Sequence, residues 1–232
     1  MQTRNTFAMK LFTVLLPIVV GVVGATSASA APVFFDDFTS GASPLWSNTA
    51  GGWVAAGGEY YASVPPNPPA FTRIPIDLTD FSMDVDVRQV EKGGVWLRAD
   101  ATGNNAVLLA WGDGFESSGG LYWHVYQGGY DAGANPGGSG INGTDIHIHV
   151  EVIGNTYQAF LNGASTPTTT FTYSGFSHGY VGLFDNSLGI YNGHPGEGQT
   201  YDNFQVSVPE PASLALLSLG LFGLGFSRRK KA

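Results

Sequence analysis

Apolar and polar residues alternate along most of the middle of the chain. The period of two is clear in four runs, 81–87, 95–99, 121–125 and 146–152. Such alternation is typical of a strand with one buried and one exposed face. Turns rich in glycine and asparagine separate the runs, and no stretch of the middle has the 3.6-residue period of a capped helix. The pattern predicts an all-β domain, an antiparallel β-sandwich or barrel with about a dozen strands around one core.

The first thirty residues have the layout of a secretory signal peptide. Arg4 and Lys10 form a positive start, residues 11–25 are apolar, and Ala28-Ser29-Ala30 is a box of small residues suited to cleavage. A membrane anchor is the alternative, but the apolar core is short for one. We expect export, with residues 1–30 removed.

The last residues of the chain have three parts in a fixed order. Pro209-Glu210-Pro211 precedes an apolar run, 213–226, and the chain ends with the basic residues Arg228, Arg229, Lys230 and Lys231. The run is short for a full bilayer crossing but suits a transient helical anchor, and the basic cluster would stay in the cytoplasm. An ordinary transmembrane anchor is the alternative, although it needs no proline triplet.

This tail resembles the PEP-CTERM sorting signal of Gram-negative bacteria that produce exopolysaccharide. The resemblance covers residues 208–232 and implies an exosortase, a membrane transpeptidase, as partner. It also implies cleavage near the triplet and release to the cell envelope or the extracellular matrix. The expected organisation is a signal peptide at 1–30, a β-sandwich at 31–207 and a sorting signal with a hydrophobic helix at 208–232.

Charge and cysteine content exclude several classes of function. The chain has a net charge of -8, but between Ala31 and Val208 there are 17 acidic residues and only 4 basic ones, a net charge of -13. A surface this acidic repels phosphate backbones, so we expect no nucleic-acid partner. Cysteine is absent, which excludes disulfides, thiolate metal sites and a cysteine nucleophile.

Several motifs follow one another along the middle in a recognisable order. They are Phe34–Phe38, Trp53 with Gly57–Tyr60, Ile148–Gly163, Gly179–Leu183 and Tyr201–Val206. In this order they resemble the concanavalin A-like (laminin G-like) jelly rolls of lectins and glucanases. The resemblance implies a jelly-roll fold, although a fold by itself does not determine function.

The carboxylates give little support for catalysis. Retaining glucanases of this fold place two carboxylates about two positions apart on one strand, so that both flank the scissile bond. Here only Asp84 and Asp86 have that spacing, and beside Arg88 they also fit the solvated face of a strand. We therefore predict no catalytic residue.

Two groups of side chains are candidates for metal binding. His147, His149 and Glu151 share one strand face. The two histidines would bind zinc or another transition metal if a third ligand came from elsewhere, but all three residues also fit the polar face of an ordinary strand. Asp36 and Asp37 in the first strand and Asp202 and Asn203 in the last would meet if the terminal strands pair. Their oxygens suit a structural calcium ion, although acids in so acidic a domain also cluster by chance.

Aromatic residues mark a candidate carbohydrate-binding face. Two strands contribute to it, one with Trp96, Arg98 and Asp100 and the other with Tyr122, His124 and Tyr126. Aromatic rings can stack on sugar rings, and the polar groups can bond to hydroxyls. Packing of these rings in a core is the alternative. Residues in glycine-rich loops, Tyr130, Tyr191 and His194, could complete a groove.

Three hypotheses for function follow. The leading one is a non-catalytic carbohydrate-binding or exopolysaccharide-associated protein, sorted to the envelope or matrix. The second is a glycan-processing enzyme on the same fold, which would depend on Asp84, Asp86 or Glu151. The third is a structural surface protein that binds no ligand and assembles with itself.

Overall fold

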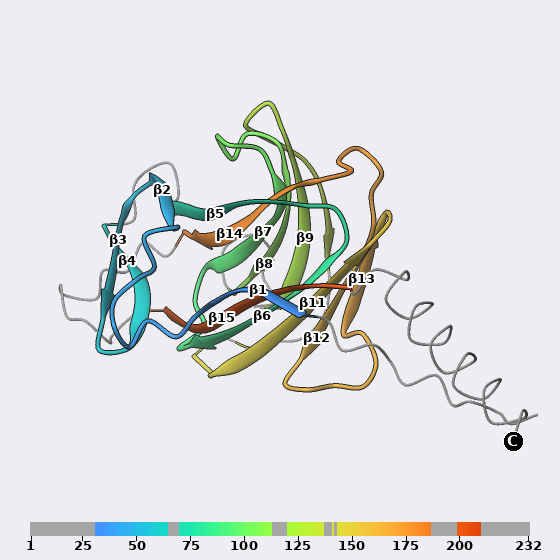
Figure 1. Cartoon of the computed structure of the whole chain (residues 1–232). Coiled ribbons are helices and arrows are strands. Elements are labelled where there is room, and N and C mark those ends of the chain that lie inside the picture. Colours follow the sequence, from blue (N-terminus) through green and yellow to red (C-terminus); the bar gives the residue numbers. More distant parts are fainter. Residues whose placement is uncertain are drawn as a thin grey trace, which may run out of the picture.

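The computed structural model of the protein (Figure 1) describes residues 31–64, 70–112, 120–136, 141, 143–186 and 199–209. Within these ranges the chain forms fifteen β-strands and no helix, so none of these residues belongs to a helix that could cross a membrane. The predicted signal peptide and, apart from Val208 and Pro209, the predicted sorting signal lie outside the described residues.

One sheet has eight antiparallel strands. Its order is β13-β12-β11-β6-β15-β4-β3, and β1 also pairs with β15. The strands are β1 (Ala31–Asp36), β3 (Gly52–Ala56), β4 (Glu59–Val64), β6 (Phe81–Arg88), β11 (Ile146–Ile153), β12 (Thr156–Leu161), β13 (Thr169–Thr172) and β15 (Thr200–Val208).

The other sheet has seven antiparallel strands in the order β10-β9-β8-β7-β14-β5-β2. They are β2 (Ser47–Ala50), β5 (Ala70–Leu78), β7 (Gly93–Ala99), β8 (Ala106–Trp111), β9 (Leu121–Gln127), β10 (Tyr130–Pro136) and β14 (Gly179–Asp185). Figure 1 shows the two sheets as two layers, so the predicted antiparallel β-sandwich is confirmed.

The main core lies between the sheets and is built from alternate residues of their strands. In β6 and β11 buried and half-buried residues alternate, as the sequence pattern predicts. The inward residues of these two strands are Phe81, Met83, Val85, Val87, Ile146, Ile148, Val150 and Val152. Every described strand and core residue lies within residues 31–209, which are called the folded unit below.

A second apolar cluster covers the other face of the seven-stranded sheet. Its buried members are Phe71, Trp96, Ala99, Ala106, Leu108, Ala110 and Phe184. Because this sheet is covered on both faces, all residues of β7 and β8 are buried, which alternation alone does not predict.

A bulge in β7 changes the direction of Arg98. Tyr180 pairs with Ala99 and Gly182 pairs with Trp96, so two residues of β7 lie opposite one residue of β14. Arg98 has a positive φ of 50° at this point. The expectation that Arg98 shares a strand face with Trp96 is therefore wrong, because the bulge turns its side chain inward.

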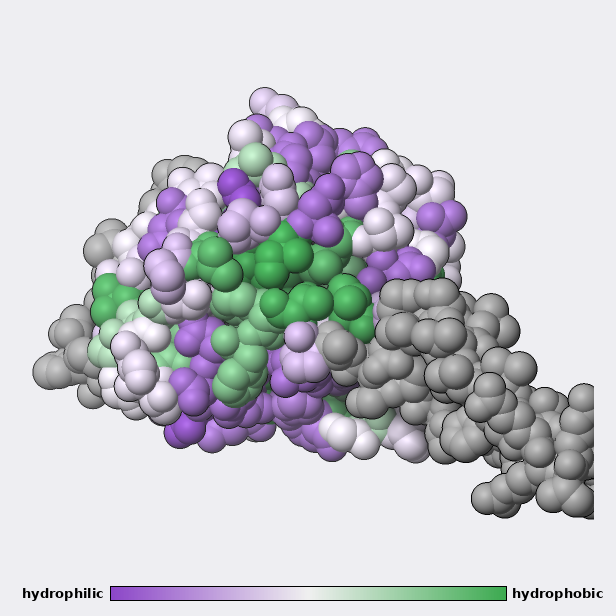
Figure 2. Space-filling model, in the orientation of Figure 1, coloured by the Kyte–Doolittle hydropathy of each residue, from purple (hydrophilic) through white to green (hydrophobic). Residues whose placement is uncertain are grey.

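The first and last strands lie side by side in the eight-stranded sheet. Ala31 pairs with Val208, so the first and last residues of these two strands are neighbours (Figure 1). On the outer side of β1, Val33 and Phe35 are 41% and 54% exposed. Figure 2 shows apolar side chains gathered in the middle of this face, near β1, with polar side chains above and below.

Candidate functional site

The structure brings together four of the six residues predicted for carbohydrate binding. Trp96 on β7 and Tyr122, His124 and Tyr126 on β9 all lie on the outer face of the seven-stranded sheet. The Trp96 ring meets the ring of Tyr126 edge-on, with the centroids 4.9 Å apart. Alternation on these strands thus predicted the shared face.

These rings are packed rather than exposed. Tyr122, His124 and Trp96 are only 0%, 3% and 4% exposed, and Tyr126 is half-buried. Trp96 and Tyr126 belong to the second apolar cluster, and Tyr122 and His124 are buried beside it, so these four rings do not present open ring faces. The Nε1 atom of Trp96 is nevertheless buried without a hydrogen-bond partner. A buried donor of this kind costs about 1–3 kcal/mol of stability.

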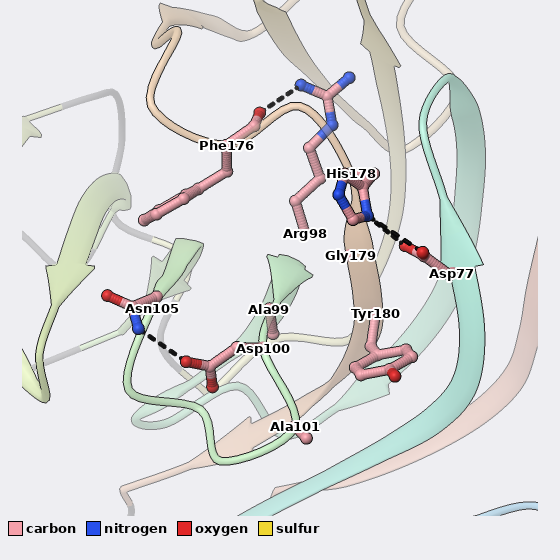
Figure 3. Close-up of a pocket in the computed structure, with 10 residues that line it drawn as sticks. All are labelled: Asp77, Arg98, Ala99, Asp100, Ala101, Asn105, Phe176, His178, Gly179 and Tyr180. Carbon is pink, nitrogen blue, oxygen red and sulfur yellow. Dashed lines mark hydrogen bonds and ion pairs between the residues drawn. The ribbon is translucent and has the colours of Figure 1, made fainter.

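A pocket of about 290 Å³ lies at the end of the seven-stranded sheet (Figure 3). The ends of β5 and β7, the start of β14 and the loops beside them form its walls. Its lining residues are Asp77, Arg98, Ala99, Asp100, Ala101, Asn105, Phe176, His178, Gly179 and Tyr180. In Figure 3 the rings of Phe176 and Tyr180 lie on opposite sides of Ala99.

The polar groups of the pocket are held by hydrogen bonds. Asp77 Oδ1 and His178 Nδ1 lie 2.8 Å apart, and both side chains are more than half exposed. Asn105 Nδ2 donates to Asp100 Oδ2 at 2.7 Å, and Asp100 Oδ1 accepts from Thr102. Burial opposes ionisation of Asp100, but the bonds from Asn105 and Thr102 outweigh it and lower its pKa. Asp100 is therefore a charged acceptor at neutral pH.

Gly179 and Tyr180 shape the apolar wall of the pocket. Gly179 has a φ of 153°, and a Cβ atom there would lie 2.5 Å from the backbone carbon of Arg98. Only glycine allows this close approach. The Tyr180 ring is half-buried, and the Arg73 guanidinium carbon lies 4.5 Å from its centroid. The cation fixes the ring at the pocket edge.

Arg98 supports the pocket from behind. Its guanidinium donates to the backbone carbonyls of Thr79 and Phe176, at 3.1 Å and 2.8 Å, and points away from Asp100 in Figure 3. Of the predicted carbohydrate-binding residues, only Arg98 and Asp100 line this pocket. The other lining residues were not predicted, because they come from segments far apart in the sequence. The sequence features that could have pointed to the pocket are a solitary histidine, His178, and the turn residue Asn105.

The predicted calcium site does not assemble. The terminal strands pair as expected, but Asp36 faces inward, where its carboxylate accepts from the backbone N–H of Phe38 and Ser43 and from Trp46 Nε1. Asp37 bonds to Thr39, and Asp202 and Asn203 lie on the outer face, against Arg88 and Asp86. The expectation is wrong because alternation and a bulge in β15 place the oxygens on opposite faces.

The polar face of β6 and β11 has the predicted histidines and carboxylates in contact with one another. His147 Nδ1 lies 2.7 Å from Asp86 Oδ1, and His149 Nδ1 lies 2.8 Å from Asp84 Oδ1. Across the described ranges, no three His, Asp or Glu side chains are placed to hold a metal ion. Of the loop residues proposed to complete a groove, Tyr130 is 80% exposed, while Tyr191 and His194 lie outside the described residues.

The tail of the chain matches a known sorting signal. Residues 207–230 match the family model of the PEP-CTERM protein-sorting motif. An exosortase recognises this motif, so the protein is exported across the inner membrane to the cell envelope or the extracellular surface. No curated protein matches the chain.

Solved structures show the same fold at low sequence identity. A carbohydrate-binding module, CBM66, from Bacillus subtilis is 14% identical, with a TM-score of 0.51 over 70% of this chain and 95% of that chain. A protein with a galectin-like fold from Bacillus subtilis is 12% identical, with a TM-score of 0.55 over 76% and 96%. A β-1,3-glucanase from Mycobacterium marinum is 12% identical, with a TM-score of 0.50 over 77% and 99%. The chain is thus a jelly-roll β-sandwich that carries a PEP-CTERM sorting signal at its C-terminal end.

Proposed function

We propose that the exported sandwich is a non-catalytic carbohydrate-binding protein, associated with exopolysaccharide at the cell envelope or in the extracellular matrix. The observation that carries the proposal is the pocket of Figure 3, where ring faces and polar groups converge. Similarity of fold to a carbohydrate-binding module and to a galectin-like protein supports it by analogy.

The pocket has the chemistry that saccharides require. Tyr180 and Phe176 offer aromatic surface for the C–H face of a sugar ring. Asp77 can accept hydrogen bonds from hydroxyls, while His178 and Asn105 can donate. A volume of about 290 Å³ lies at the small end of ligand pockets, which favours one sugar unit over a long oligosaccharide.

The carboxylates of the pocket favour binding over hydrolysis. A glycosidase needs a general acid whose pKa is raised, so that it is protonated near neutral pH. Hydrogen bonds instead lower the pKa of Asp100, and its oxygens already accept four hydrogen bonds, from Thr102, Asn104 and Asn105. The second carboxylate, Asp77, pairs with His178 rather than with another carboxyl group.

A glycan array followed by calorimetry tests the proposal, with the folded unit of residues 31–209. We expect saturable binding, and we expect Tyr180→Ala to lower the affinity about tenfold, because the stacking surface is lost. Tyr180→Phe keeps the ring and is the matched control. No binding to any glycan by a well-folded sample would overturn the proposal. Release of new reducing ends would favour the enzyme hypothesis, and sugar-independent assembly would favour the structural one.

A further inference from the structure

The outer face of the eight-stranded sheet carries a straight row of side chains across five strands. In register order, Phe35 on β1 pairs with Gln205 on β15, Gln205 with Asp84 on β6, Asp84 with His149 on β11, and His149 with Phe160 on β12. Four strand spacings separate the two phenylalanines, about 19 Å. The row therefore has an aromatic ring at each end and polar groups between them.

Carboxylate and histidine side chains alternate along and beside this row. Asp86, His147, Asp84, His149 and Glu151 follow one another, with contacts of 2.7, 3.3, 2.8 and 3.4 Å between neighbouring oxygen and nitrogen atoms. Asn203 Nδ2 donates to the other oxygen of Asp86 at 2.8 Å. This network fixes the orientation of each side chain before any ligand arrives, which lowers the entropic cost of binding.

A pocket of about 340 Å³ lies over the row, with walls that differ in chemistry. Asp84, His147, His149 and Glu151 form the polar side, and Phe160, Gly163 and Ala164 form the apolar side. The rings of His149 and Phe160 lie 5.5 Å apart. Each of the two carboxylates uses one oxygen in a hydrogen bond within the described structure, Oδ1 of Asp84 and Oε1 of Glu151. The other oxygen of each, Oδ2 of Asp84 and Oε2 of Glu151, is left as an acceptor.

We propose that this row is a second saccharide-binding surface, on the sheet opposite the first pocket, and that it takes an extended oligosaccharide. Phe160 and Phe35 supply the stacking surfaces, and the free carboxylate oxygens accept hydroxyl hydrogens. Two sites on opposite sheets let one molecule connect two polysaccharide strands, which raises overall avidity. This connecting role, unlike the second site itself, rests on the proposed function of the pocket of Figure 3.

The test counts sites on the folded unit by calorimetry with laminarihexaose, cellohexaose and galactohexaose. At concentrations that leave a tenfold weaker site unfilled, we expect two filled sites per chain for the unaltered protein, one for Phe160→Ala, one for Tyr180→Ala and none for the double variant. Thr170→Ala, an exposed change on the same outer face, is the matched control and keeps two sites. Asp84→Asn, which keeps the side-chain shape, should weaken the second site about tenfold.

The outcomes separate the two proposals. Loss of a site in Phe160→Ala but not in Tyr180→Ala would support the second surface and would contradict saccharide binding in the pocket of Figure 3. Equal site counts in the unaltered protein and Phe160→Ala overturn the second surface, as does absence of binding to all three hexaoses. Binding of zinc to the His147 and His149 cluster in place of sugar would also overturn it. Light scattering with laminarin should rise for the unaltered protein and for neither single variant.

Discussion

The buried guanidinium of Arg98 ties three parts of the chain together. Its side chain is 1% exposed and bonds to the carbonyls of Thr79 and Phe176, with the ring of Tyr157 beside it and the carboxylate of Asp80 at 3.6 Å. A buried charge is tolerated only where hydrogen bonds and an opposite charge compensate it. The same bonds hold the loop that places Phe176 in the pocket.

Replacing Arg98 should therefore destabilise the protein far more than replacing an exposed arginine. We expect Arg98→Met to lower the free energy of unfolding by about 3 kcal/mol, because two partly buried carbonyls lose their donors and the buried side chain loses its hydrogen bonds. Arg88→Met removes ion pairs of a side chain that is 54% exposed and should cost less than about 1 kcal/mol. Urea denaturation measures both. Similar costs for the two variants would contradict the role of Arg98.

His149 should make stability depend on pH. Its hydrogen bond to Asp84 raises its pKa above the usual value, burial opposes this, and the charges of Asp84 and Glu151 add to the increase. A raised pKa in the folded state means that the stabilisation is complete below about pH 6.5 and is lost as pH rises through the raised value.

The variant His149→Gln measures this contribution. The difference in free energy of unfolding between the unaltered protein and His149→Gln should be larger at about pH 5.5 than at about pH 8.5. Titration of the imidazole by NMR should give a pKa above that of a free histidine, and Asp84→Asn should lower it. A difference that stays constant with pH would refute the assignment.

At the scale of elements, Asp36 holds the connection from β1 to β2. It lies at the end of β1, and its two carboxylate oxygens accept from the backbone N–H of Phe38 and Ser43 and from Trp46 Nε1. Trp46 in turn packs against Phe34, with the ring centroids 5.7 Å apart. The carboxylate thus holds this connection through three hydrogen bonds, without a metal ion.

Stability should depend on Asp36 and not on calcium. We expect Asp36→Ala to lower the free energy of unfolding by about 2–4 kcal/mol, since three donors lose their acceptor. Asp37→Ala, at an exposed neighbouring carboxylate, should cost less than about 1 kcal/mol. Thermal melting with calcium and with a chelator should give the same midpoint for the unaltered protein. A midpoint raised by calcium would restore the metal hypothesis.

Periodicity predicted strands and faces where the strands are regular. It correctly placed Val85 and Ile148 inside and His149 outside. It failed at Arg98 because one extra residue in β7 reverses the faces beyond it. It also could not show that His178 meets Asp77, 101 positions away, because the pairing of distant strands is set by the whole fold.

At the scale of the whole molecule, the sorting signal begins where the sandwich ends. β15 ends at Val208, which pairs with Ala31, and Pro209 is exposed outside the sheet. Proline has a fixed φ and no N–H to donate, so it separates the last strand from the segment beyond it. We therefore expect cleavage near the proline triplet to leave the described core intact.

Replacing the triplet should block processing and leave the fold intact. In an exosortase-containing host, we expect a protein with Pro209→Ala, Glu210→Ala and Pro211→Ala to stay in the membrane fraction at the mass of the unprocessed chain, and released protein to fall to background. Ser213→Ala, just beyond the triplet, is the control and should be released normally. Because the described core ends at Val206, with Val208 packed against it, the triplet lies beyond every described core residue, and the variant sandwich should melt at the same temperature as the unaltered one. Normal release of the triplet variant would show that exosortase does not read these residues, and a lowered melting temperature would show that the triplet belongs to the fold.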